Sequence, residues 1–204
     1  MSASRTLKSL LLATALLASA GSASAADTFV LDPTHTAITW DISHFGFSHP
    51  SGKFMSVDGA VVLDEKNPQN SSVNVTIALA EMNTGVTKLD EHLKSKDFFD
   101  LEHFPTAKYV SSKVNVTSPN TATVDGELTL HGVTKPVTLS VKLNKLAENF
   151  FKKQTAGFTA TTTLKRSDFG MNTYLPGLGD EITIAIESEA NIKTDEAAKA
   201  AIAK

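Results

Sequence analysis

Strict alternation of apolar and polar residues along eight separate segments is the feature that most limits the fold. In the first segment Ile38, Trp40 and Ile42 alternate with Thr39 and Asp41. Successive side chains of a strand point to opposite faces, so each segment predicts a strand with one buried and one solvated face. The eight segments are 38–44, 57–63, 73–79, 107–116, 122–130, 137–143, 158–164 and 182–190.

Eight such strands separated mostly by short turns predict an all-β fold, either a closed antiparallel barrel or a sandwich. The alternation also predicts which side chains face inward. On the inward face we expect Ile38, Trp40, Ile42, Val75, Ile77, Leu128, Leu139, Phe158 and Ile184. On the solvent face we expect Thr39, Asn74 and Thr183.

Two short helices interrupt or follow the strands. The first is expected over residues 87–94, with Thr87 as its N-cap and Asp90 in its first turn. The second is expected over residues 195–203, with acidic residues first and lysines last, as the helix dipole favours. No change of composition marks a linker, so residues 26–204 are expected to form one domain.

The first 25 residues are typical of a secretory signal peptide. Two basic residues precede an apolar run over residues 10–20, and the small-residue sequence Ala-Ser-Ala ends at Ala25. The alternative is a membrane anchor, but the run is shorter than the ~20 residues that a span needs. We therefore expect cleavage near Ala25/Ala26, a periplasmic location and no stable membrane insertion.

Composition excludes several classes of protein. The 204 residues contain no cysteine, which excludes disulfides, thiolate metal sites and thiol catalysis. The formal net charge of −3 argues against a nucleic-acid-binding protein. The six histidines show no spacing that is typical of a metal site, so we expect no metal and no cofactor.

The apolar residues favour a hollow interior. Many of the eleven phenylalanines lie at strand ends and in connections, where they either plug a packed core or surround the mouth of a cavity. An eight-stranded barrel is the size that either fills with side chains or holds one small ligand. Four small residues on the inward faces favour the cavity: Gly59, Gly126, Ala160 and Ser188.

Several short motifs occur along the chain. They are Leu31-Asp32-Pro33-Thr34-His35-Thr36, His44-Phe45-Gly46, Gly52-Lys53-Phe54, His92-Leu93-Lys94-Ser95, Asp97-Phe98-Phe99-Asp100, His103-Phe104-Pro105-Thr106-Ala107, Leu130–Val137, Arg166–Met171 and Gly179–Ile182. Together these segments resemble the YceI-like family of exported, lipocalin-like, polyisoprenoid-binding proteins. The segments occur in family order over nearly all of residues 26–204. The Gly-x-Trp signature of lipocalins is absent, because Ile38-Thr39 precedes Trp40.

The resemblance implies a lipocalin-like barrel that holds a polyisoprenoid lipid or the tail of an isoprenoid quinone, as a carrier or storage protein without catalytic residues. We expect the apolar chain to contact Ile38, Trp40, Ile42, Phe98, Phe99, Phe158 and Ile184. We expect the polar head group to lie at one barrel mouth near His35, His92, Lys94 and Arg166.

Two other functions remain open at this point. One is an enzyme that acts on an isoprenoid through histidine and arginine at the barrel mouth, which requires those groups to converge within hydrogen-bond reach. The other is a periplasmic stress protein with a packed interior and no ligand. The sequence also leaves a homodimer open.

Overall fold

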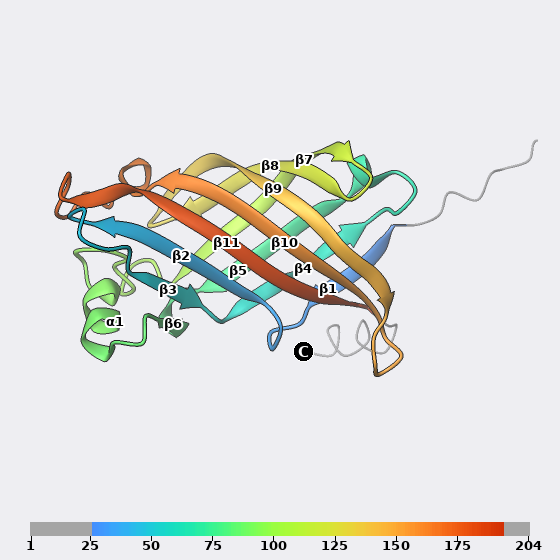
Figure 1. The fold of residues 1–204 in the computed structure, drawn as a ribbon, viewed down its shortest axis with the longest axis horizontal. Coiled ribbons are helices and arrows are strands. Elements are labelled where there is room, and N and C mark those ends of the chain that lie inside the picture. Colours follow the sequence, from blue (N-terminus) through green and yellow to red (C-terminus); the bar gives the residue numbers. More distant parts are fainter. Residues whose placement is uncertain (1–25, 194–204) are drawn as a thin grey trace, which may run out of the picture.

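Eleven strand segments close into an elongated antiparallel barrel in the computed structural model, which describes residues 26–193 (Figure 1). The strands are β1 (Asp27–Leu31), β2 (Ala37–His44), β3 (Ser51–Phe54), β4 (Val57–Leu63), β5 (Ser72–Ala78), β6 (Met82–Asn83), β7 (Thr106–Ser118), β8 (Thr121–Leu130), β9 (Val133–Glu148), β10 (Gln154–Lys165) and β11 (Leu178–Ile192). The helices are α1 (Thr87–Lys94) and the short 3₁₀ turns η1 (Pro68–Asn70), η2 (Leu79–Glu81) and η3 (Arg166–Phe169).

The eleven segments correspond to eight barrel strands, because three of those strands are broken. Both β1 and β2 pair with β11, so they act as one interrupted strand. On the other side, β1 pairs with β4, which pairs with β5. In the same way, β2 pairs with β3, which pairs with β6. The remaining neighbours follow chain order from β5 through β7, β8, β9, β10 and β11, which closes the barrel onto β1 and β2.

All eight predicted strands are present, and every pairing between neighbours is antiparallel. The sequence analysis missed β1, β3 and β6. These segments are only five, four and two residues long, too short to show a convincing period of two. The interrupted strands therefore become visible only when the barrel is closed.

Helix α1 is confirmed, but the predicted cap is wrong. Val86 is the N-cap residue and makes no side-chain cap, while Thr87 is already the first helical residue. Asp90 instead accepts hydrogen bonds from the backbone N–H and the hydroxyl of Thr84, at 2.8 and 2.7 Å. This carboxylate thus ties the helix to the segment that follows β6. The expected signal peptide and the expected helix over 195–203 lie outside the described residues.

Burial along the strands shows that the interior is hollow. On β11, Thr183 and Ala185 are exposed, whereas the inward Ile182, Ile184 and Ile186 are only half-buried. Inward side chains of a packed barrel would be fully buried. Full burial occurs instead at Phe29 on β1, Leu79 in η2 and Phe169 in η3, which are 0, 1 and 1% exposed.

Two of the four small residues that were expected to leave room for a cavity, Gly59 and Gly126, do not enlarge the barrel interior. A Cβ on Gly126 would lie 2.5 Å from the ring of Tyr109, and one on Gly59 would lie 2.3 Å from the carbonyl oxygen of Asn74. These glycines make room for their neighbours in the wall. Ala160 and Ser188 do face the interior.

None of the helices in residues 26–193 combines the length and the apolar character needed to cross a membrane.

Candidate ligand-binding cavity

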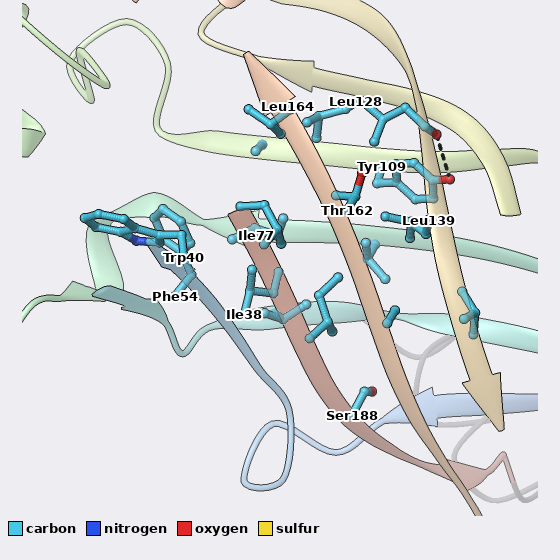
Figure 2. A pocket seen from close by; sticks show the side chains of 18 of the residues that line it. Ile38, Trp40, Phe54, Ile77, Tyr109, Leu128, Leu139, Thr162, Leu164 and Ser188 are labelled. Atoms are coloured by element: carbon cyan, nitrogen blue, oxygen red, sulfur yellow. Dashed lines mark hydrogen bonds between the residues drawn. The ribbon is translucent and has the colours of Figure 1, made fainter. Parts of the chain in front are cut away.

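A cavity of about 940 Å³ occupies the interior of the barrel. Its lining reaches His44 and Tyr174 at the end of the barrel that carries α1, and Ser118 and Thr121 at the opposite end (Figure 1). This volume is close to the upper limit of ordinary small-molecule sites. Figure 2 shows side chains from several strands pointing into the same space.

The inward face was predicted correctly. Nine of the expected residues line the cavity: Ile38, Trp40, Ile42, Val75, Ile77, Leu128, Leu139, Phe158 and Ile184. Phe98 and Phe99 also line it and come from the segment after α1. A one-residue register error would have moved a whole strand to the other face, so the agreement also confirms the registers.

The few polar groups in the middle of the wall are satisfied by the barrel itself. The Tyr109 hydroxyl donates a hydrogen bond to the carbonyl of Val124 at 2.9 Å and lies 3.2 Å from that of Val137. Burial, with a smaller effect from Asp125, raises the pKa of Tyr109 to about 12, so this phenol stays neutral. Thr162 donates to the carbonyl of Thr138 at 2.9 Å. The middle of the cavity therefore offers an apolar, uncharged surface.

Trp40 is an exception among these polar groups. Its Nε1–H is buried and has no hydrogen-bond partner. Among the described side chains, no other buried nitrogen or oxygen atom lacks a partner. The indole lies against Gly52 on β3, where a Cβ would come within 2.4 Å of the ring. An unpaired buried donor costs about 1–3 kcal/mol. Trp40 thus leaves an unpaired donor inside the wall, packed against Gly52.

Aromatic side chains surround the cavity at the α1 end. His92 of α1 packs edge-to-face on Phe98, with 5.0 Å between ring centroids, and Tyr174 lies 6.4 Å from His92. Phe99 packs edge-to-face on Phe54 of β3 at 5.7 Å. The His92 Nε2 is 3.7 Å from a carboxylate oxygen of Asp97. These contacts place the His92 imidazole among the aromatic rings of this mouth.

Arg166 also lines the cavity at this end, and its side chain is 3% exposed. Its guanidinium donates hydrogen bonds to the carbonyls of Gly179, Met171 and Leu178, at 2.7, 2.8 and 3.0 Å. Burial lowers the pKa of Arg166 and the nearby Asp180 opposes that shift, but the group remains a cation at any ordinary pH. Within residues 26–193 its guanidinium makes no ion pair. Arg166 is thus a structural tie between η3 and the start of β11, and it also carries an unpaired charge beside the cavity.

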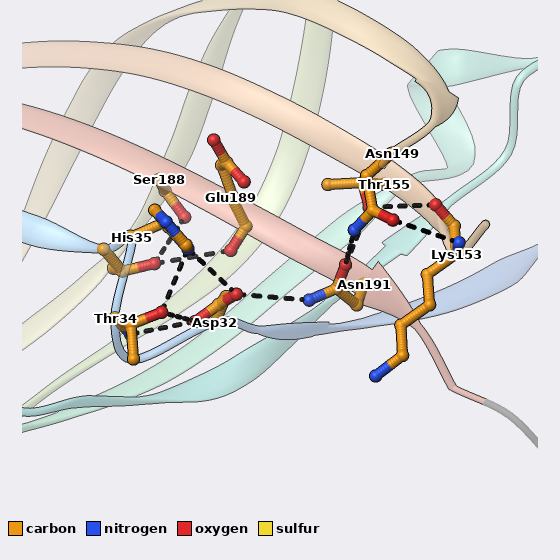
Figure 3. Close-up of polar contacts among 10 residues, drawn as sticks. Asp32, Thr34, His35, Asn149, Lys153, Thr155, Ser188, Glu189 and Asn191 are labelled. Carbon is orange, nitrogen blue, oxygen red and sulfur yellow. Dashed lines mark hydrogen bonds and ion pairs between the residues drawn. The ribbon is translucent and has the colours of Figure 1, made fainter. Parts of the chain in front are cut away.

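The other two residues expected near the head group lie outside the lining. Lys94 is in the last turn of α1, at the same end as Arg166, but it does not reach the cavity wall. His35 lies in the connection between β1 and β2, where its Nδ1 is 3.1 Å from Asp32 and its backbone carbonyl accepts from the N–H of Glu189 (Figure 3).

The expectation that all four residues share one mouth is wrong for His35. Arg166 is bonded to Leu178 at the start of β11, whereas His35 contacts Glu189 near the end of that strand. Eleven residues of extended strand separate these two points by about 35 Å. His35 entered the expectation through a short motif, and a motif carries no information about which end of a barrel a loop occupies.

The sequence analysis did not assign several polar residues to the cavity lining. Tyr174 lies in a connection at the α1 end, His44 is the last residue of β2, and Tyr109 is on β7. The alternation over 107–116 already placed Tyr109 on the same face as Ala107, so that signal was available. Connections have no such periodicity, so nothing local could have indicated Tyr174. His44, at the end of β2, continues the alternation of Ile38, Trp40 and Ile42. Among the described residues, no group of three or more histidine, aspartate or glutamate side chains is arranged to hold a metal ion.

The closed eight-stranded barrel and its apolar cavity define a lipocalin-like protein with a hollow interior. The model of the YceI-like domain matches residues 29–190, and the chain belongs to the YceI-like family. A UPF0312 protein of Pseudomonas putida strain W619 is 41% identical over 169 residues, which is 82% of this chain and 87% of that protein.

Two solved structures extend the comparison. BcnA of Burkholderia cenocepacia is similar with a TM-score of 0.72 and 24% identity, over 78% of this chain and 99% of BcnA. A polyisoprenoid binding domain of Saccharophagus degradans, implicated in plant cell wall breakdown, is similar with a TM-score of 0.62 and 13% identity, over 81% of this chain and 98% of that domain. At these identities the likeness is one of fold.

Proposed function

We propose that the protein holds one long apolar lipid chain, of the polyisoprenoid class, in the interior of its barrel as a carrier or storage protein. The observation that carries the proposal is the cavity of about 940 Å³, which extends between the two ends of the barrel and has an almost wholly apolar lining. An elongated apolar space suits a linear chain better than a compact polar metabolite. Each CH₂ removed from water contributes about 0.8 kcal/mol, from which the costs of association are subtracted.

The chain is assigned to the middle of the barrel. There it would contact Ile38, Trp40, Ile42, Phe158 and Ile184, and near the α1 end it would contact Phe98 and Phe99. The described polar groups in this region, apart from the Trp40 indole, already have partners in the wall, so they do not compete for water when the chain enters. The fold shared with the polyisoprenoid binding domain of Saccharophagus degradans agrees with this assignment.

The polar head group is assigned to the α1 end, near His92, Lys94 and Arg166. A buried guanidinium without an ion pair favours an anion, and Lys94 in the last turn of α1 adds positive charge at the same end. A neutral head group such as that of a quinone is the second candidate. The Trp40 indole N–H has no partner in the wall, but it is buried against Gly52, so it can donate to a ligand carbonyl only if the indole moves. His35 has no part in this assignment.

Export is part of the proposal. The basic and apolar pattern of residues 1–25 and the small residues before Ala26 support cleavage there and a periplasmic location. N-terminal sequencing of the protein from the periplasmic fraction should start near Ala26. A chain that keeps Met1, or one recovered from the cytoplasm, would contradict export without touching the ligand proposal.

Titration of the delipidated protein tests the ligand directly. Trp40 is the single tryptophan of the chain and lines the cavity, so its fluorescence reports occupancy. We expect saturable binding of a polyprenol. Ala160→Phe should reduce its affinity at least tenfold by filling the cavity, whereas the matched control Ala185→Phe, on the exposed face of β11, should not. Absence of binding, or equal effects of the two variants, would refute an interior site.

The head group is tested by comparing a polyprenyl phosphate with the matching prenol. Lys94→Gln should weaken the phosphate about tenfold and leave the prenol unchanged, because a charge-assisted contact is worth about 1.5–3 kcal/mol. Lys88→Gln, on the exposed first turn of α1, is the control. Equal losses for both ligands would reject the anionic head and favour a neutral ligand such as a quinone. Mass spectrometry of lipid from natively purified protein identifies the ligand independently.

A further inference from the structure

The hairpin between β9 and β10 exposes two adjacent phenylalanines. Phe150 and Phe151 are 92 and 77% exposed, and their rings pack edge-to-face with 5.4 Å between centroids. Large apolar side chains that are this exposed cost free energy in water, and a pair of them at one tip indicates a surface that is covered in use. Neither residue lines the cavity, so the ligand does not account for them.

The hairpin tip is held in this shape by Asn149. The Asn149 Oδ1 accepts hydrogen bonds from the backbone N–H groups of Phe151 and Lys153, at 2.8 and 3.1 Å. The Asn149 backbone N–H donates to the Lys153 carbonyl at 2.8 Å. Asn191 of β11 also contacts Asn149, with 3.4 Å between their side-chain amides (Figure 3). These bonds hold the backbone of the tip in the conformation that exposes the two rings.

The tip also projects beyond the neighbouring strands. β8 begins at Thr121, which pairs with Lys142 of β9. β9 then continues to Glu148 with β10 as its partner. In Figure 1 this hairpin extends away from the barrel at the end opposite α1. Within residues 26–193, β8 therefore does not shield Phe150 and Phe151.

The hairpin segment itself carries positive charge, although the whole chain has a formal net charge of −3. Residues 142–153 contain four lysines and one acid, Glu148. Lys152 lies 3.8 Å from Glu148, but the two groups are 84 and 63% exposed, and such a pair is worth little. Lys153 follows directly, and Lys142 and Lys145 are exposed on β9. Exposed phenylalanines beside a positive cluster match the surface of an anionic bilayer.

We propose that the tip formed by Phe150, Phe151, Lys152 and Lys153 docks the protein peripherally on anionic phospholipid membranes. The rings would enter the boundary between head groups and acyl chains, and the lysines would bind the anionic head groups. The opposite end of the barrel also exposes Phe45 and Phe47, but residues 44–51 contain no lysine, arginine or acid. Two lysines directly follow the phenylalanine pair of the hairpin, and this adjacent charge selects the hairpin.

Co-sedimentation with vesicles tests this proposal on the chain from Ala26 onward. The protein should bind vesicles of phosphatidylglycerol and phosphatidylcholine in equal parts, and bind pure phosphatidylcholine at least tenfold more weakly. Phe150→Ser combined with Phe151→Ser should lower the affinity about 100-fold. Lys152→Gln combined with Lys153→Gln should lower it about 10- to 30-fold on the anionic vesicles, with a weaker dependence on salt.

Phe47→Ser is the matched control, because Phe47 is 89% exposed at the other end of the barrel. It should leave vesicle binding unchanged. Lack of binding by the unsubstituted protein, or full binding by the double phenylalanine variant, would overturn the proposal. A dimer in light scattering that dissociates with the same double variant would also overturn it, in favour of a second copy as the partner. The Trp40 titration of the cavity is independent of all these results, so a failure here leaves the ligand proposal intact.

Discussion

Two phenylalanine-to-alanine substitutions distinguish a hollow barrel from a packed one. Phe29 of β1 is 0% exposed and does not line the cavity, whereas Phe158 of β10 is half-buried and does. Phe29→Ala removes a ring from close-packed surroundings and leaves a new void, so it should cost about 3–5 kcal/mol of unfolding free energy. Phe158→Ala opens no new void, because the space beside the ring already exists. Losing the buried half of one ring should then cost about 1–1.5 kcal/mol.

The measurement is denaturant unfolding of each delipidated variant, followed by circular dichroism. Equal slopes of free energy against denaturant would show that both variants unfold from the same native barrel. The expected difference of about 2 kcal/mol or more is well outside the error of such comparisons. Phe158→Ala should also weaken polyprenol binding, whereas Phe29→Ala should not. Similar losses of stability for both variants would refute the hollow interior and return the packed, ligand-free barrel as the better interpretation.

Three further outcomes follow from the contacts described above. Arg166→Gln removes the guanidinium that donates to three backbone carbonyls. It should lower the free energy of unfolding by about 3–5 kcal/mol in the same assay. A loss below about 1 kcal/mol would show that other contacts hold η3 in place. Tyr109→Phe leaves the carbonyls of Val124 and Val137 without their donor and should cost about 1–2 kcal/mol without changing polyprenol affinity, whereas a large affinity loss would make the phenol a ligand contact. The hydrogen bond and the charge of Asp32 raise the pKa of His35 above 6.5, so its stabilising effect is complete below pH 6.5 and is lost as the pH rises through the raised value. An NMR titration should show this raised pKa and its return toward 6.5 in Asp32→Asn, and a pKa at or below 6.5 in the unsubstituted protein would contradict the pairing.

The wall of the barrel was readable from the sequence because it depends on a local rule. A side chain such as Ile184 faces inward because its neighbours Thr183 and Ala185 face outward, and this relation holds wherever the strand lies. The same rule fails for short pieces. β1 and β3 contain too few residues to show the alternation, and only their pairing with β11 and β2 defines them as strands.

The ends of the barrel were less predictable, because they are made of connections. The short motifs around His35 and Arg166 carried the family resemblance equally well, yet the closed barrel separates them along β11. The observed role of the Arg166 side chain also differs from the expected one. The sequence suggested a head-group ligand, and the structure adds three carbonyl bonds that tie η3 to β11.

By itself the sequence determined the strand count, the inward faces and the apolar nature of the interior, since these depend on the order of residues along each strand. Tertiary structure alone decided the size of the cavity, and it showed that Gly59 and Gly126 make room for wall neighbours rather than for a ligand. It also decided which loops lie at the same end of the barrel. In addition, it placed the Phe150–Phe151 pair beyond the end of β8. These properties depend on distances between residues far apart in the chain, which are fixed only when strand pairing closes the barrel.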